Sequence, residues 1–164
     1  MKFFHKSKKD NSDNLQSARV EENAKQNCDT AIRYAKSFEK DFDFSRNSIK
    51  DLEEILDYYS KDISRDRPTE HQIWSMSIIF GSYLEEVMLK NGLSEKGYKW
   101  GIDNTSDIPL LINAAGNYIT PNDKVYKRLV NGAEDNVLFF LRRNYGNGLM
   151  FQKNGIHGLQ FITS

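Results

Sequence analysis

The segment from Pro68 to Gly92 constrains the fold more than any other part of the chain. Thr69 and Gln72 stand three residues apart and match a capping box at a helix start, and Asn91–Gly92 is the usual kind of helix end. The apolar residues between them cover more than one stripe: Ile73, Trp74, Met76, Ile78, Ile79, Phe80, Tyr83, Leu84, Val87 and Met88. The sequence therefore predicts a central helix to about Lys90 that is covered on several sides.

Two helices are predicted before this central one. From about Leu15 to Phe38, apolar residues recur every three or four positions without Pro or Gly. A second helix is predicted after Ser45 or Ser48, either of which can cap it. Its apolar stripe is Ile49, Leu52, Leu56 and Tyr59. The charged stretch Asp62 to Pro68 is expected to be a loop.

Short strands are predicted after the central helix. The expected elements are a strand at Tyr98–Ile102, a hairpin of Leu110–Asn113 and Asn117–Thr120, helices at Pro121–Val130 and Glu134–Asn144, and a terminal hairpin around Asn154–Gly155. These strands are too close together for crossover helices, so the sheet should be mostly antiparallel. We expect an α+β fold with three N-terminal helices packed on a small sheet, two further short helices and a C-terminal hairpin.

The length of 164 residues fits one domain, and the twenty aromatic residues (ten Phe, eight Tyr, two Trp) are interpreted first as core residues. Residues 1–13 are polar and predict a flexible charged tail, with a single α+β domain at 14–164. Phe3 and Phe4 stand among lysines, so a membrane-surface adaptor is an alternative. A solubilising tail is the favoured interpretation.

Charge and cysteine content exclude several classes of protein. Lys plus Arg equals Asp plus Glu, 23 against 23, which argues against binding nucleic acid through bulk charge. A near-neutral chain repels its copies weakly, so a homo-oligomer is plausible. A single cysteine, no signal-peptide pattern and no long apolar run favour a cytoplasmic protein without a transmembrane segment.

No motif predicts catalysis, a metal or a cofactor. The histidines are scattered, at His5, His71 and His157. The stretch Asp103–Asp107 lacks the glycine and terminal Glu of a calcium loop. Cys28 falls on an apolar stripe and is interpreted as a core residue. His71 and Ser75 can touch on a helix, but an active pair also needs an orienting acid.

Two polar groups are retained as candidates. Glu85 and Glu86 are adjacent on the central helix, about 100° apart, and Glu86 follows a very apolar face where a buried carboxylate would need a partner. Lys124, Lys127 and Arg128 cluster on one short helix and could form an anion site. A solvated face is the favoured interpretation, because such side chains commonly lie over apolar neighbours.

The order of these motifs resembles a family of small bacterial domains of unknown function. In that family a Gly-x-Tyr-x-Gly-Glu helix precedes a Trp strand and a Pro-x-x-x-Val-x-Lys-Arg-x-x-Asn-Gly segment. Here Gly81-Ser-Tyr-Leu-Glu-Glu86, Trp100 and Pro121–Gly132 correspond, over about Ser45 to Tyr145. Glu85 departs from the pattern at its second Gly, where a helix could pack less closely.

The resemblance implies an α+β fold in a bacterium and no established activity or cofactor. The positions it shares are Tyr83, Glu86, Trp100, Lys127, Arg128 and Asn131. They are candidates for ligand or partner binding, or for structural roles such as a buried salt link from Glu86 to Lys127 or Arg128.

Our leading hypothesis is a non-enzymatic interaction domain with an unknown protein partner, of which an immunity or toxin-neutralising protein is one kind. The alternative is a small-ligand-binding or enzymatic domain with a pocket near Glu86, Trp100 and Lys127, where the Trp would provide a stacking wall.

Overall fold

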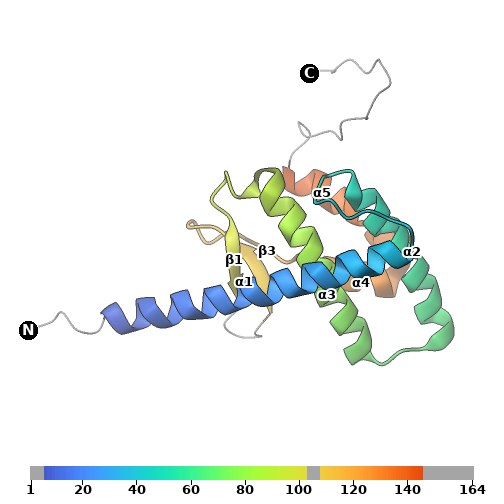
Figure 1. The fold of residues 1–164 in the computed structure, drawn as a ribbon, viewed down its shortest axis with the longest axis horizontal. Helices are drawn as coiled ribbons and strands as arrows, with labels where there is room; N and C mark the ends of the chain where they lie inside the picture. The colour runs from blue at the N-terminus through green and yellow to red at the C-terminus, as the bar shows by residue number, and fades with distance from the viewer. Residues whose placement is uncertain (1–5, 103–107, 146–164) are drawn as a thin grey trace, which may run out of the picture.

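The computed structural model describes residues 6–102 and 108–145, and this part of the chain has the predicted α+β arrangement (Figure 1). The elements are α1 (Lys6–Ser37), α2 (Ser48–Asp66), α3 (Glu70–Met88), a π-helical turn η1 (Leu89–Leu93), β1 (Lys99–Ile102), β2 (Pro109–Ile112), β3 (Tyr118–Ile119), α4 (Pro121–Asn131), a 3-10 turn η2 (Gly132–Asp135) and α5 (Val137–Tyr145). The three N-terminal helices precede the small sheet, as predicted.

Helix α3 is the central helix of the domain, with α1 and α4 packed against it (Figure 1). Its predicted capping box is confirmed: Thr69 N donates to Gln72 Oε1 at 2.8 Å and Gln72 N donates to Thr69 Oγ1 at 3.3 Å. The stripe that α1 turns toward the core is buried and made largely of small residues: Val20, Ala24, Cys28, Ala31 and Ala35. These small side chains let α1 and α3 approach each other closely.

The three strands form one antiparallel sheet in the order β1-β2-β3. Trp100 is opposite Leu111, and Leu111 is opposite Ile119. The hairpin between β2 and β3 is confirmed. Asn113 Oδ1 accepts from the backbone N–H groups of Ala115 and Asn117, which closes the turn.

The start of α1 and the end of α2 differ from the sequence prediction. Helix α1 begins at Lys6 rather than near Leu15, within the segment expected to be a tail. Helix α2 continues to Asp66, so the expected loop from Asp62 is wrong. Asp62 pairs with Arg65 at 3.1 Å and the half-buried Ile63 extends the apolar stripe. The helix ends where Arg67 takes φ 47° before Pro68.

The helix predicted at Glu134–Asn144 is divided. Glu134 and Asp135 belong to η2, and Asn136 separates it from α5. Asn136 Oδ1 accepts from Leu138 N at 2.8 Å, as an N-cap residue does. The capping carboxamide therefore sets the start of α5 at Val137.

Several predictions lie outside the described residues: the terminal hairpin around Asn154–Gly155, the loop Asp103–Asp107, Phe3 and Phe4, and the histidines His5 and His157. Among the described residues, no helix is long and apolar enough to cross a membrane. The same ranges contain no group of three His, Cys, Asp or Glu side chains placed to hold a metal ion.

Candidate functional site

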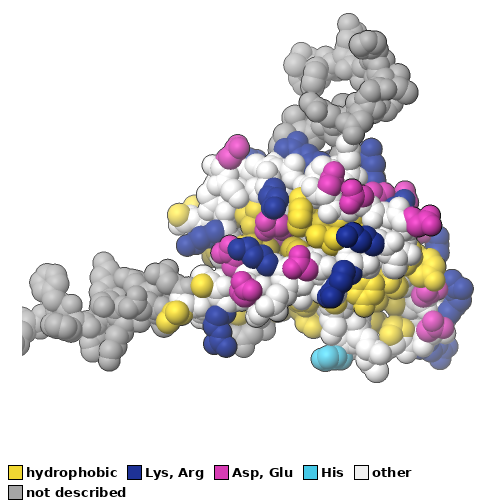
Figure 2. All heavy atoms as spheres, viewed as in Figure 1, with side chains coloured by type: hydrophobic (Ala, Val, Ile, Leu, Met, Phe, Trp, Pro, Cys, Tyr) yellow, Lys and Arg dark blue, Asp and Glu magenta, His cyan; other side chains and the backbone are white. Residues whose placement is uncertain are grey.

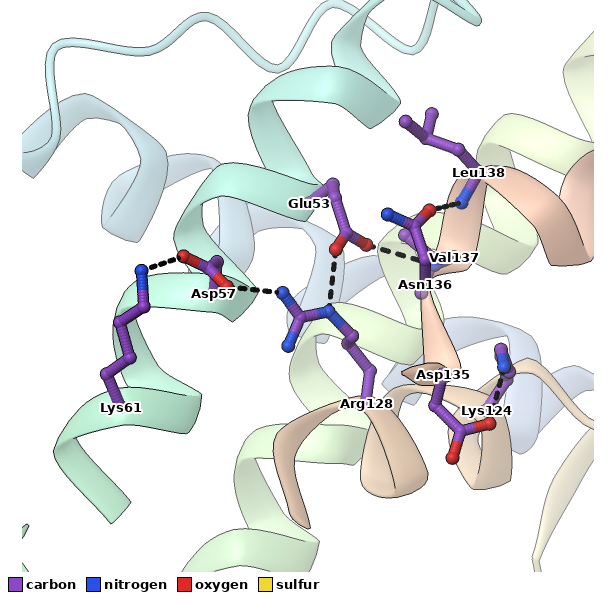
Figure 3. Close-up of polar contacts among 9 residues, drawn as sticks. All are labelled: Glu53, Asp57, Lys61, Lys124, Arg128, Asp135, Asn136, Val137 and Leu138. Carbon is purple, nitrogen blue, oxygen red and sulfur yellow. Dashed lines mark hydrogen bonds and ion pairs between the residues drawn. The ribbon is translucent and has the colours of Figure 1, made fainter. Parts of the chain in front are cut away.

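Arg128 is buried at the junction of α2, α4 and α5 (Figure 3). Its Nε donates to Glu53 Oε1 at 2.6 Å and its Nη2 donates to Asp57 Oδ1 at 2.8 Å, both on α2. The second oxygen of Glu53 accepts from Val137 N, the first residue of α5, at 3.0 Å. One carboxylate therefore joins three helices, and Arg128 has a structural role.

The other α4 candidates lie on the outer side of that helix. Asn131 Nδ2 donates to Asp135 Oδ2 at 2.7 Å, and Lys124 Nζ contacts Asp135 Oδ1 at 2.6 Å. Lys127 is exposed. The predicted salt link from Glu86 to this helix is wrong for Arg128, because Arg128 pairs with α2.

Tyr83 holds the segment between α1 and α2 against α3. Its ring stacks on Phe42 with centroids 4.1 Å apart. Its hydroxyl accepts from Phe44 N at 3.0 Å and shares a 2.6 Å hydrogen bond with Ser48 Oγ. Burial raises the pKa of Tyr83 to about 12. These contacts make Tyr83 a core anchor with no access to a ligand.

Glu85, rather than Glu86, is the buried carboxyl group of α3. Glu85 is fully buried, and its Oε1 accepts from Asn122 Nδ2 of α4 at 3.2 Å. Burial raises the pKa of Glu85 well above 4.5, against the opposing effect of the Asn122 hydrogen bond. Among described residues, neither Glu85 Oε2 nor Asn122 Oδ1 has a hydrogen-bond partner. The neutral acid is therefore the form suited to this site.

We expect Glu85→Gln to remove a pH dependence of stability. A carboxyl whose pKa rises on folding contributes stability that is fully present below its unfolded pKa, near 4.5, and is lost as pH rises through the folded pKa. The free energy of unfolding of the wild type should fall relative to Glu85→Gln above pH 4.5, by up to about 1.4 kcal/mol per pH unit. Urea unfolding of both proteins from pH 4.5 to 8 measures the difference. A constant difference would show that the pKa of Glu85 does not rise on folding.

Glu86 and Trp100 line one groove, between α1, the end of α3 and β1. Its volume is about 440 Å³. The other lining residues are Ser17, Ala18, Glu21, Leu89, Lys90, Ser94, Tyr98 and Lys99. Glu86 contacts Lys90 at 3.5 Å, and Trp100 is only 6% exposed. Lys127 is not among the lining residues. The groove thus combines two of the three residues predicted for a pocket, with the Trp ring mostly packed in the core.

Aromatic side chains form an exposed surface where α1 packs beside α2. We name Tyr34, Phe38, Tyr58 and Tyr59 the aromatic face. Phe38 lies with its ring centroid 5.1 Å from that of Tyr58 and 5.6 Å from that of Tyr59. Tyr34 is 42% exposed and Tyr58 50%. Figure 2 shows hydrophobic side chains gathered around the C-terminal half of α1.

The aromatic face was not predicted, because aromatic residues were interpreted as core residues. A signal was present in the spacing. Tyr34 directly precedes Ala35 of the buried α1 stripe, and Tyr58 directly precedes Tyr59 of the α2 stripe. A large aromatic residue one position off a buried stripe lies at its edge, where it is half-covered.

Comparison of the chain with protein-family models, with curated proteins and with solved structures finds no match.

Proposed function

We propose that this chain is a cytoplasmic, non-enzymatic protein-interaction domain whose binding surface is the aromatic face. The observation that carries the proposal is the half-exposure of Tyr34 and Tyr58 within a connected group of rings. Tyrosine is enriched at protein interfaces, because it offers a large contact area and a hydroxyl that can bond a partner.

A buried residue of α3, Phe80, packs against the inner side of the aromatic face. Phe80 of α3 is 1% exposed, and its ring centroid lies 5.9 Å from that of Tyr34 and 6.0 Å from that of Tyr59. The exposed rings therefore rest on a packed core residue. Rings already held in place lose little conformational freedom on binding, so more of the contact energy appears as affinity.

The groove beside Glu86 and Trp100 supports a second candidate function, the binding of a small ligand. Its volume of about 440 Å³ is within the usual range of ligand sites. Glu86 and Lys90 could orient a polar ligand there. We rank this function second because Trp100 is only 6% exposed and offers little of its ring to a ligand in the groove.

Site-specific photocrosslinking tests the proposed interaction. We expect p-benzoylphenylalanine at Tyr58 to crosslink one specific protein in the cells that make this chain, because an aromatic photoprobe preserves the contact surface. The matched control is the same probe at Tyr118, a tyrosine of β3 that is 66% exposed. Adducts resolved by mass spectrometry identify the partner, and an adduct between two copies would identify a homo-oligomer.

A second substitution links the crosslink to the surface itself. Tyr34→Ser should reduce the Tyr58 adduct at least about tenfold if Tyr34 is part of a binding hot spot. Circular dichroism checks that the variant stays folded. Equal adducts from Tyr58 and Tyr118, or an adduct that is indifferent to Tyr34→Ser, would contradict the proposed surface.

A further inference from the structure

A second hollow lies where the end of α3, the segment before α2 and the end of α5 meet. Its volume is about 370 Å³. The residues that line it are Arg46, Lys90, Asn91, Gly92, Glu95, Lys96 and Tyr145. Figure 1 shows the ends of α3 and α5 side by side, and Tyr145 Oη donates to Met88 O at 2.6 Å. We name this hollow the basic pocket.

The charge of the basic pocket contrasts with that of the chain. Three cationic side chains, Arg46, Lys90 and Lys96, line it together with one acid, Glu95. Three positive charges less one negative give a formal charge of +2, in a protein whose formal net charge is zero. Like charges brought together at a concave surface favour an anion.

Arg46 is held in place by its neighbours, and it has a buried donor without an acceptor among the described residues. Its Nη2 donates to Asn91 O at 2.6 Å, and its guanidinium carbon lies 5.2 Å from the centre of the Tyr145 ring. Within the described residues, the buried Nε of Arg46 has no acceptor. A buried donor without an acceptor is costly, and an oxyanion in the pocket would supply one.

The two lysines are held mainly by aromatic rings. Lys90 Nζ lies 4.2 Å from the centre of the Phe44 ring, and Lys96 Nζ lies 6.0 Å from that of Tyr145. The contact of Lys90 with Glu86 is long, at 3.5 Å. Contacts of this kind position an ammonium group while leaving N–H donors for a ligand.

The π-helical turn η1 leaves open space beside Gly92. Gly92 has φ +125°, and a Cβ built on it would meet no heavy atom within 4 Å. Asn91 Nδ2 donates to Phe44 O at 2.8 Å and to Val87 O at 2.7 Å, which fixes the turn against its neighbours. The shape of the pocket is therefore set by the fold.

We propose that the basic pocket binds a phosphate group, as inorganic phosphate or as a small phosphate monoester. A phosphate dianion matches the formal charge of +2 on the lining residues, part of which is offset by Glu86 beside Lys90. Its several oxygens suit the combination of a guanidinium with two ammonium groups, because Arg supplies directed donors and Lys supplies compact charge. This site is separate from the aromatic face and does not depend on the proposed protein interaction.

Titration of the full chain with inorganic phosphate tests the proposal. We expect saturable shifts of the amide NMR signals of Gly92 and Lys96 at constant ionic strength, with a dissociation constant at or below about 1 mM. Lys96→Gln and Arg46→Gln should each weaken binding about tenfold. Lys127→Gln removes an exposed lysine of α4 and should leave binding unchanged. Glu95→Gln should tighten binding, because it removes the one acid.

The remaining arms separate the two sources of the phosphate group. Glycerol 3-phosphate that binds more tightly than inorganic phosphate would indicate a phosphate monoester, and the reverse would indicate free phosphate. Lys96 is exposed, so its variant tests the site even if Arg46→Gln disturbs the turn. Shifts that do not saturate by about 10 mM, or that are the same in Lys96→Gln and the wild type, would overturn the proposal.

Discussion

Arg128→Met is expected to lower the free energy of unfolding by about 3–5 kcal/mol, because it leaves Glu53 as a buried charge without its partner. The side chain of Arg128 is 1% exposed and that of Glu53 is 12% exposed, so water cannot replace the lost pairing. Methionine keeps most of the volume of the arginine stem, which limits the contribution from a cavity. Urea unfolding followed by circular dichroism measures the loss.

Two further variants isolate the cause. Glu53→Gln keeps an oxygen for Val137 N while removing the charge, so the double variant with Arg128→Met should be more stable than Arg128→Met alone. Lys124→Gln breaks the partly exposed pair with Asp135 and should cost no more than about 1 kcal/mol. If Arg128→Met costs as little as Lys124→Gln, the pair of Arg128 with Glu53 does not hold the helices together.

Gly81→Ala is expected to destabilise the protein by about 3 kcal/mol, although alanine is the better helix former. A Cβ on Gly81 would lie 2.0 Å from Asn122 Oδ1 and 2.8 Å from Asn122 Cα. The second of these is a backbone atom, so α3 and α4 would have to move apart. Separation would also weaken the hydrogen bond between Glu85 and Asn122.

Gly116→Ala is the matched control for this substitution. Gly116 has φ +81° in the hairpin turn, with no heavy atom within 4 Å of an added Cβ. Its replacement should cost about 1–2 kcal/mol through backbone conformation alone. Thermal unfolding of both variants separates crowding from conformational strain. A Gly81→Ala protein as stable as the wild type would show that α3 and α4 can separate freely.

The elements that could be predicted from the sequence are those with local signals. The capping box of Thr69 and Gln72 and the turn after Asn113 each depend on residues a few positions apart, and the structure has both. The end of α2 could not be predicted as well, because a charged stretch such as Asp62 to Asp66 is compatible with either a loop or an exposed helix end.

The candidate site was harder to predict, since it depends on how the helices face one another. Glu85 and Glu86 lie about 100° apart around α3. Because α3 is apolar on most sides, its sequence does not show which of the two side chains faces the core. The departure from the family pattern at Glu85 led us to expect looser packing there, whereas Glu85 is fully buried against Asn122 of α4, one turn from the close contact at Gly81. The contact of Arg128 with Glu53 spans 75 positions and leaves no local pattern.

Helix α4 supplies the partners of both buried acids, Arg128 for Glu53 of α2 and Asn122 for Glu85 of α3. During synthesis, α2 and α3 leave the ribosome before α4 has been made. Until α4 emerges, the two carboxyl groups have only water as a partner, and hydration opposes their burial. The three N-terminal helices should therefore remain loosely associated on the nascent chain and consolidate in one cooperative step when α4 docks.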